Sequence, residues 1–338
     1  MPLAPFLVAA LVAVAALRPG PQPTARWSDP SPHEIRWITV NSSVRQEVLD
    51  WGGSGRPIVL LGCYLTAHLY DDFAPKLTDR FRVYGITRRG IGASDKPPSG
   101  YSVQRSADDV LEVLDQLKMN KPILVGYSCA GQVLSTLGSQ HSNRLGGLVY
   151  FDAADDPTLT PADYAVRFPD PTELPPSIKP APAPDYSSFA AYRLAQRRDH
   201  GVAFPEAEWR QQFTANPAGS VGASRGSPVI RRAITQDSRV KPDYARIRVP
   251  VLAIYRTGPS VEEIAADHPP HTERERGAIH QQYEATRAMV TRWQHDLLAG
   301  VATARIVDLP GANLYMFLSN EADVLRELRA FGATLTDR

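Results

Sequence analysis

The sequence is poor in cysteine and has almost no net charge. Among its 338 residues only Cys63 and Cys129 are cysteines, so a framework of several disulfides is excluded, although one pair can form. Lysine and arginine number 37 and aspartate and glutamate 36, and the lack of a long basic run argues against nucleic acid as the main partner. No apolar run reaches the roughly 20 residues of a membrane-spanning helix. These absences favour a globular protein whose partner is a small-molecule substrate or ligand.

The N-terminal segment differs from the rest of the chain. Phe6 to Leu17 form a continuous run of 12 apolar residues, within which Ala13-Val14-Ala15 supplies small residues for cleavage. We therefore expect residues 1–17 to be a signal peptide, followed by a proline-rich leader over 18–33, in a periplasmic or secreted protein. No lysine or arginine precedes the apolar run, so an uncleaved N-terminal anchor and a later start of the chain are the alternatives.

Short apolar segments with the character of strands alternate with amphipathic segments. "PIVLLG" (57–62) is the continuous apolar run of a strand buried on both faces, whereas the apolar residues of 106–117 recur at helical spacing. The alternation predicts an α/β fold with a mostly parallel sheet and helices on both faces. The expected strands are 34–40, 45–52, 57–62, 81–87, 122–127, 145–153, 250–256 and 303–310, and the expected helices are 70–80, 106–117, 131–140, 271–299 and 320–332.

The alternation is interrupted once. Proline crowds the segment from Asp156 to Asp185 and prevents a regular element there, and helical pieces follow at 187–199 and 205–213. Because strand character returns at 250, residues of about 155–248 are an insertion into a domain that spans 34–338. We expect this insertion to form a cap.

A serine follows the strand at 122–127 in "GYSCAGQVLST" (126–136). A strand that turns abruptly into a helix leaves no room for bulky residues on either side of the turn, and Gly126, Ala130 and Gly131 meet this demand. Such a turn places Ser128 at a helix N-terminus, where the helix dipole favours negative charge. Ser128 is therefore a candidate nucleophile.

The chain resembles the α/β-hydrolase superfamily in several ordered motifs. "LVGYSCAG" (124–131) is similar to the nucleophile elbow of that family, "RRGIGASDKP" (88–97) to its R-G-x-G-x-S-D loop, and "RIVDLPGANLYMFLS" (305–319) to its last strand and histidine loop. The resemblance implies an α/β-hydrolase fold with a cap after the sixth strand. It also implies Ser128 as the nucleophile, Gly126 and Gly131 as elbow glycines, and the backbone N–H groups of Cys63 and Cys129 as the oxyanion hole.

One residue departs from the family pattern. Where the family has its catalytic histidine, in a loop reading like "GANHYMFLS", this chain has Leu314, and leucine accepts no proton. Loss of that histidine costs roughly a millionfold in kcat. The acid of the triad also lacks its usual aspartate after the strand at 250–256, where only Glu262 and Glu263 occur, so Asp152 at the end of the sixth strand is the candidate.

Eight histidines could in principle replace the missing base. His68, just after the oxyanion loop, is the stand-in base that we select, although it could equally pin that loop by hydrogen bonding. His268 and His271 follow a strand in a loop, and His200 lies in the cap. His33 belongs to the leader, and His141, His280 and His295 are placed away from the serine.

The resemblance also brings the two cysteines together. If the N–H groups of Cys63 and Cys129 point at one oxygen, their Cα atoms lie within disulfide range. We expect either a disulfide across the oxyanion hole or two small buried thiols.

Two functions remain open from the sequence. The first is a serine hydrolase for a small ester, amide or lactone-type substrate, catalytically impaired because the histidine is absent. The second is a non-catalytic relative that binds a small apolar ligand or a protein partner under its cap. No metal and no organic cofactor is implied, because the sequence has neither a histidine pair on a helix face nor a phosphate-binding glycine loop.

Overall fold

The computed structural model describes residues 27–178 and 183–335. The expected signal peptide and most of the leader lie outside the described residues. Within the described part of the chain, no helix is long and apolar enough to cross a membrane.

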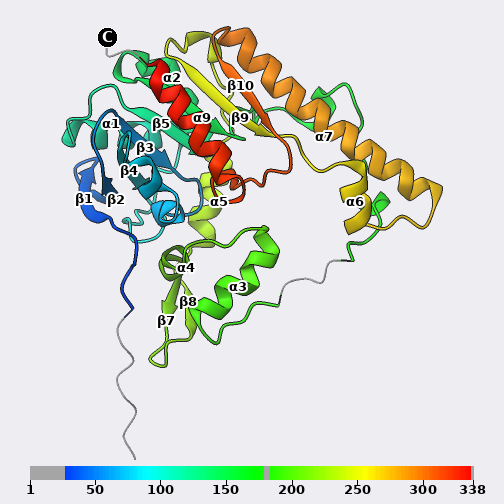
Figure 1. The fold of residues 1–338 in the computed structure, drawn as a ribbon, viewed down its shortest axis with the longest axis horizontal. Coiled ribbons are helices and arrows are strands. Elements are labelled where there is room, and N and C mark those ends of the chain that lie inside the picture. Colours follow the sequence, from blue (N-terminus) through cyan, green and yellow to red (C-terminus); the bar gives the residue numbers. More distant parts are fainter. Residues whose placement is uncertain (1–26, 179–182, 336–338) are drawn as a thin grey trace, which may run out of the picture.

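An eight-stranded sheet forms the centre of the molecule, in the order β1-β2-β4-β3-β5-β6-β9-β10 (Figure 1). β1 and β2 pair antiparallel, β2 pairs antiparallel with β4, and all later neighbours are parallel. This arrangement confirms the predicted mostly parallel sheet. The strands are β1 (Glu34–Val40), β2 (Val44–Gly52), β3 (Pro57–Leu61), β4 (Arg82–Thr87), β5 (Ile123–Tyr127), β6 (Gly147–Phe151), β9 (Val251–Arg256) and β10 (Arg305–Leu309).

Helices cover both faces of the sheet because each strand sends alternate side chains to opposite sides. In β3, Val59 packs in one core cluster and Ile58 and Leu60 in the other. The first cluster contains residues of α1 (Val103–Gln116), α2 (Ala130–His141) and α7 (Glu273–Gly300). The second contains residues of η1 (Ala67–Tyr70), η2 (Ala74–Leu77), α8 (Met316–Ser319) and α9 (Glu321–Thr334). Continuous apolar strands are therefore buried on both faces.

One predicted helix is wrong. Residues 70–80 do not form an α-helix, because they hold only the end of the short 3₁₀ helix η1 and the second 3₁₀ helix, η2. Pro75 lies in the first turn of η2. Proline has no N–H to donate and its ring collides with the carbonyl one turn earlier, so a continuous helix cannot pass through it.

The segment between β6 and β9 forms a separate group of elements. It contains α3 (Phe189–His200), α4 (Glu206–Gln212), a two-stranded hairpin of β7 (Phe213–Ala215) and β8 (Val221–Ser224), and α5 (Pro228–Asp237). In Figure 1, α3, α4 and the hairpin lie together below the main sheet. The proline-rich part before them has only the single turns η4 (Pro161–Asp163) and η5 (Pro171–Glu173), whereas the hairpin and α5 were not foreseen. Two further helices, α6 (Val261–Asp267) and the long α7, come after β9 and before β10 in the chain.

Candidate active site

Ser128 occupies a strained turn between β5 and α2. Its φ is +52°, in the left-handed region that residues with a side chain rarely adopt. The turn is tight on both sides, because a Cβ on Gly126 would lie 2.9 Å from a methyl of Leu134, and a Cβ on Gly131 would overlap the carbonyl oxygen of Ala153. The small residues of the motif are therefore required by packing, and they leave Ser128 half-buried at the N-terminus of α2.

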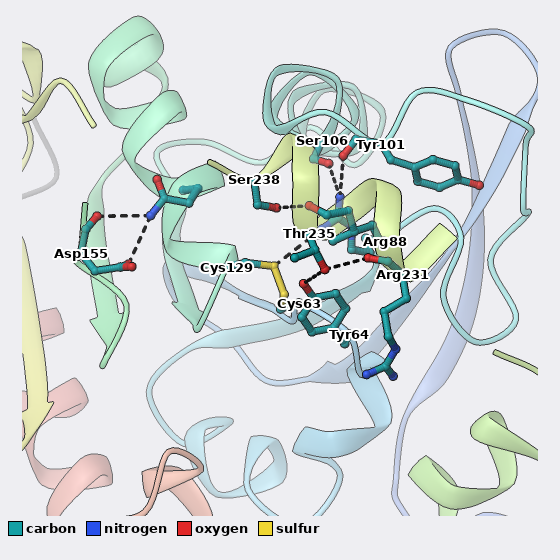
Figure 2. The surroundings of a disulfide bond; sticks show 12 residues. Cys63, Tyr64, Arg88, Tyr101, Ser106, Cys129, Asp155, Arg231, Thr235 and Ser238 are labelled. Carbon is teal, nitrogen blue, oxygen red and sulfur yellow. Dashed lines mark hydrogen bonds between the residues drawn. A yellow bond between two sulfur atoms is a disulfide. The ribbon is translucent and has the colours of Figure 1, made fainter. Parts of the chain in front are cut away.

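A disulfide joins the two chain segments that flank this serine. Cys129, directly after Ser128, is bonded to Cys63, two residues after β3, with their Cα atoms 5.3 Å apart (Figure 2). Of the two alternatives left open by the sequence, the disulfide is present, and that of two free thiols is wrong. The bond ties the loop after β3 to the start of α2, so that neither backbone segment can move without the other.

A half-buried arginine approaches the disulfide. The Arg88 guanidinium lies 4.0 Å from Cys129 Sγ and donates hydrogen bonds to the carbonyl of Tyr101 and the hydroxyl of Ser106 (Figure 2). Burial lowers the pKa of Arg88 to about 10, so the group still carries its charge at neutral pH. No such role could be read from the sequence, since Arg88 and Cys129 are 41 residues apart.

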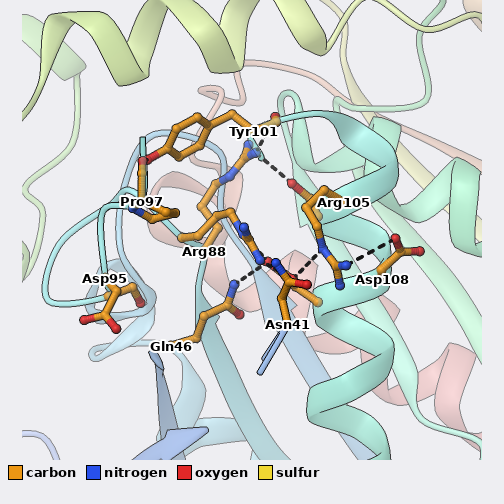
Figure 3. Close-up of polar contacts among 12 residues, drawn as sticks. Asn41, Gln46, Arg88, Asp95, Pro97, Tyr101, Arg105 and Asp108 are labelled. Carbon is orange, nitrogen blue, oxygen red and sulfur yellow. Dashed lines mark hydrogen bonds and ion pairs between the residues drawn. The ribbon is translucent and has the colours of Figure 1, made fainter. Parts of the chain in front are cut away.

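The neighbouring arginine has a structural role. Arg89 forms a two-pronged ion pair with Asp109 of α1, at 2.5 and 2.6 Å, and Gln46 and Arg105 contact the same carboxylate. Figure 3 shows Gln46 and Arg105 converging from β2 and α1. The arginine of the R-G-x-G-x-S-D motif thus joins its loop to the helix that covers the sheet.

Leu314 lies in the loop between β10 and α8. Its side chain is half-buried and packs against the second core cluster. The loop itself is ordered by Asn313, whose side chain accepts from the N–H of Tyr315 at 3.0 Å and donates to the carbonyl of His200 in the cap at 2.7 Å. Leu314 therefore presents only carbon atoms in a loop that is tied to the cap.

Asp152 directly follows β6 and is held in an ion pair. Its φ is +49°, and Arg256 Nε donates to its Oδ2 at 2.5 Å. Burial raises the pKa of Asp152, and Arg256 opposes that shift. The other carboxyl oxygen is buried without a hydrogen-bond partner among the described residues. The alternative acids are exposed on α6, where Glu263 accepts from the N–H of Ser260 as a helix cap.

His68 lies in a cluster of acidic side chains. Its Nδ1 is 2.9 Å from Asp71 Oδ2 and 3.2 Å from Asp29 Oδ2, and its Nε2 is 3.2 Å from Gln211 Nε2 and 3.5 Å from Glu47 Oε1. Burial alone lowers the pKa of His68, but the hydrogen bonds to Asp29, Asp71 and Glu47 outweigh it and raise the pKa to about 12. Both ring nitrogens are thus engaged inside this cluster, and none of these contacts involves Ser128.

A buried glutamate of the cap contacts the loop that carries Cys63, and the sequence did not reveal it. Glu208 of α4 accepts from the backbone N–H of Thr66 at 3.0 Å and from its hydroxyl at 2.5 Å, and Gln212 donates to the other oxygen. Burial raises the pKa of Glu208 to about 7, against these hydrogen bonds, which lower it. The cap is therefore fastened to the chain three residues beyond Cys63.

A cavity of about 410 Å³ lies between the cap and the loops after β3 and β10. This volume is within the range of small-molecule sites. His200 stacks on Phe204 in its wall, with ring centres 4.6 Å apart, and lies 6.0 Å from the ring of Tyr315. The lining is rich in aromatic side chains and includes Tyr64, Leu65, His200, Phe204, Trp209 and Tyr315.

The elbow, the sheet order and the cap after β6 together define a hydrolase-type fold, and the sequence comparison agrees. Residues 52–327 match the model of the alpha/beta hydrolase family, and the chain belongs to that family. The family resemblance inferred from the motifs is thereby confirmed.

The individual curated relatives either have low sequence identity to this chain or match only part of it. The AB hydrolase superfamily protein YisY of Bacillus subtilis is 28% identical over 214 residues, which cover 60% of this chain and 74% of that protein. The 2-(acetamidomethylene)succinate hydrolase of Mesorhizobium japonicum is 31% identical over 35% of this chain and 41% of its own length. For most of the curated relatives named first, the chain aligns with only about 40% of their length.

Solved structures show the same fold over nearly the whole chain. The crystal structure of E-2-(acetamidomethylene)succinate hydrolase superposes with a TM-score of 0.60 at 18% identity, covering 88% of this chain and 98% of that one. A serine hydrolase of carbazole degradation, the CarC enzyme, superposes with a TM-score of 0.58 at 14% identity, covering 88% of this chain and 98% of that one. At such identities the likeness concerns the fold alone.

Proposed function

We propose that the chain is a serine-hydrolase-type protein that takes a small ester, amide or lactone-type substrate under its cap. Ser128 is the nucleophile, and the backbone N–H groups of Cys63 and Cys129 form the oxyanion hole. The observation that carries the proposal is the strained backbone of Ser128, with φ of +52° at a helix N-terminus, next to a disulfide that holds both oxyanion segments together. Strain of this kind persists where the surrounding structure enforces it, and it is concentrated at functional sites.

The absence of a catalytic histidine at position 314 determines the turnover rate that we expect for the proposed hydrolase. Without a histidine at position 314, a serine triad loses roughly a millionfold in kcat, and the oxyanion hole and substrate binding leave about 10³-fold over water. The protonated, fully engaged His68 is a poor proton acceptor, which weighs against it as the stand-in base. His200 of the cap lines the cavity, but Ser128 is not among the residues that line it. We expect turnover to be slow.

Asp152 retains the role of the acid in this proposal. It directly follows the sixth strand, as it does in the relatives that carry their acid there, and its Oδ1 is buried without a hydrogen-bond partner among the described residues. Its ion pair with Arg256 favours the ionised carboxylate and opposes the burial that raises the pKa of Asp152.

The second candidate is a non-catalytic protein that binds a small apolar ligand or a protein partner. The observations that favour it are the hydrocarbon side chain of Leu314 and the aromatic lining of the cavity. This candidate differs from the first in one measurable property, the reactivity of Ser128.

A fluorophosphonate probe separates the two candidates. Labelling of the wild-type protein that is lost in Ser128→Ala and kept in Ser139→Ala, a serine further along α2, supports the hydrolase. Absence of labelling in the folded, disulfide-bonded protein overturns it and leaves the binding protein.

Export is part of the proposal. Disulfides form and persist in oxidising compartments, so the bond between Cys63 and Cys129 supports a periplasmic or secreted protein. Fractionation of the native host followed by N-terminal sequencing tests this, and a reduced protein with an intact Met1 in the cytoplasm would contradict it.

A further inference from the structure

Four side chains that could bind a metal ion converge on the side of η1. Asp29 and His33 come from the segment before β1, and His68 and Asp71 come from η1 and the residue after it. One possible ligand atom from each lies within 4.8 Å of the others. The side chains of His33, His68 and Asp71 are only 3 to 4% exposed and that of Asp29 is 21% exposed.

The contact between His33 and Asp71 does not have the geometry of a hydrogen bond. His33 Nδ1 and Asp71 Oδ1 lie 3.0 Å apart, yet each atom is buried without a hydrogen-bond partner among the described residues. A close contact without hydrogen-bond alignment is compatible with two lone pairs that face one cation between them.

The outer nitrogen of His68 is held by further groups. Its Nε2 faces Glu47 Oε1 at 3.5 Å and the side chain of Gln211 at 3.2 Å, while Glu47 is itself fixed by the hydroxyl of Thr87 at 2.8 Å. A metal-binding histidine usually has its second nitrogen held by a carboxylate in this way, which orients the first nitrogen.

We propose that Asp29, His33, His68 and Asp71 form a binding site for a zinc ion, with two imidazole nitrogens and two carboxylate oxygens as ligands. Tetrahedral zinc with bonds of about 2.0–2.1 Å separates its ligand atoms by about 3.3 Å. The separations of 2.9 Å from His68 Nδ1 to Asp71 Oδ2, 3.2 Å from His68 Nδ1 to Asp29 Oδ2 and 3.0 Å from His33 Nδ1 to Asp71 Oδ1 lie near this value. Imidazole and carboxylate together suit zinc better than calcium or magnesium, which prefer oxygen ligands alone.

The site is accessible to an ion. Asp29 and Asp71 line a cavity of about 810 Å³ that also touches the α3–α4 connection and the end of α8. Bound zinc would join the segment before β1 to η1, and η1 begins directly after Thr66, which Glu208 fastens to the cap. Zinc would therefore brace the loop that carries Cys63 at the end where the loop enters η1.

Zinc binding is measured on the chelator-treated full-length protein by elemental analysis and calorimetric titration with zinc chloride. We expect one zinc ion per chain and a higher Tm in its presence. His33→Gln and Asp29→Asn, which each remove one ligand, should each weaken binding by at least about tenfold, and Glu47→Gln by about 10- to 100-fold. The control is His295→Gln, which changes an exposed histidine 3.4 Å from Asp296 and should bind zinc as the wild type does.

A proton on His68 shared with Asp71 is the metal-free alternative. It predicts no stoichiometric zinc, no change of Tm with zinc, and equal behaviour of the His33 and His295 variants, and any of these results overturns the proposal. Cobalt substitution gives a second measurement, because a tetrahedral site with two imidazoles produces a visible absorption band that His33→Gln should abolish. Neither measurement depends on catalysis, so the outcome is separate from that of the proposed hydrolase activity.

Discussion

Arg256, the last residue of β9, donates from its Nε to Asp152 at 2.5 Å, across the ends of two neighbouring parallel strands. The carboxylate is 5% exposed and the guanidinium 47% exposed. Arg256 is thus the counter-ion of the buried carboxylate that we propose as the acid of the triad.

Removal of the counter-ion should destabilise the fold. In Arg256→Gln the buried carboxylate of Asp152 loses its partner, and we expect the free energy of unfolding to fall by about 1–2 kcal/mol. The expected loss is this small because Arg256 is half-exposed and water screens the ion pair. Asp152→Asn is the matched control, since asparagine tolerates the left-handed backbone and carries no charge to desolvate. Urea denaturation at neutral pH measures both. Equal stability of Arg256→Gln and the wild type would show that the ion pair contributes nothing.

Restoring the family's base should restore activity if the rest of the site is intact. Leu314→His places an imidazole in the loop after β10, and hydrolysis of a simple aryl ester should rise by orders of magnitude. Leu314→Gln, similar in size and without a basic nitrogen, is the control. Addition of Asp152→Asn to Leu314→His should cancel most of the gain if Asp152 orients the new histidine. An unchanged rate in Leu314→His would mean that the acid or the oxyanion geometry is also deficient.

The disulfide should contribute strongly to stability. It closes a loop with a sequence separation of 66 residues, and the chain-entropy relation gives about 4 kcal/mol for a loop of this length. We expect Cys63→Ser/Cys129→Ser to lose about this amount in urea denaturation. Mass spectrometry with alkylation before and after reduction provides the direct check. Two thiols that alkylate freely in the native protein would contradict the bond itself.

Glu208 should make stability depend on pH. Its folded pKa of about 7 lies above the usual value, so the folded state binds this proton more tightly than the unfolded chain. The stabilisation is complete below the ordinary pKa of 4.5 and is lost as pH rises through about 7, by about 3 kcal/mol in total. Glu208→Gln has no titrating carboxyl at this position, so its free energy of unfolding should fall correspondingly less as pH rises.

The control for that experiment is Glu206→Gln on the same helix, where Glu206 pairs with Arg210. Burial also raises the pKa of Asp155 to about 7, so the stability of the wild type falls with rising pH for more than one reason. The difference between the wild type and Glu208→Gln isolates the contribution of Glu208. A parallel decline in the wild type and Glu208→Gln would exclude Glu208 as a source of the dependence.

Much of the fold could be predicted because local and global signals agree. Continuous apolar runs such as 57–62 mark strands buried on both faces, and the small residues around Ser128 identify the elbow without any tertiary information. Pro75 was visible in the sequence, yet a helix was predicted there, and the backbone constraint of proline prevailed. The β7–β8 hairpin has only three and four residues per strand, too few for a period-2 pattern.

The candidate site was predictable only where residues are close in sequence or occupy a motif. Ser128, Leu314 and the cysteine pair follow from motif positions. The contact of Glu208 with Thr66 spans 142 residues, and that of His33 with Asp71 joins the leader to η1. The sequence carries no local signal for such pairs, because a carboxylate on a cap helix or a histidine in a leader is typical of solvent-exposed surface.

The bond between Cys63 and Cys129 also has a topological consequence. Ser128 lies inside a covalent ring that includes β4, α1 and β5. The exposed residues Pro98 and Ser99 lie in the loop between β4 and α1. A protease that cuts there would open the ring without releasing a fragment, so the nucleophile and the loop after β3 would remain one molecule in a nicked chain.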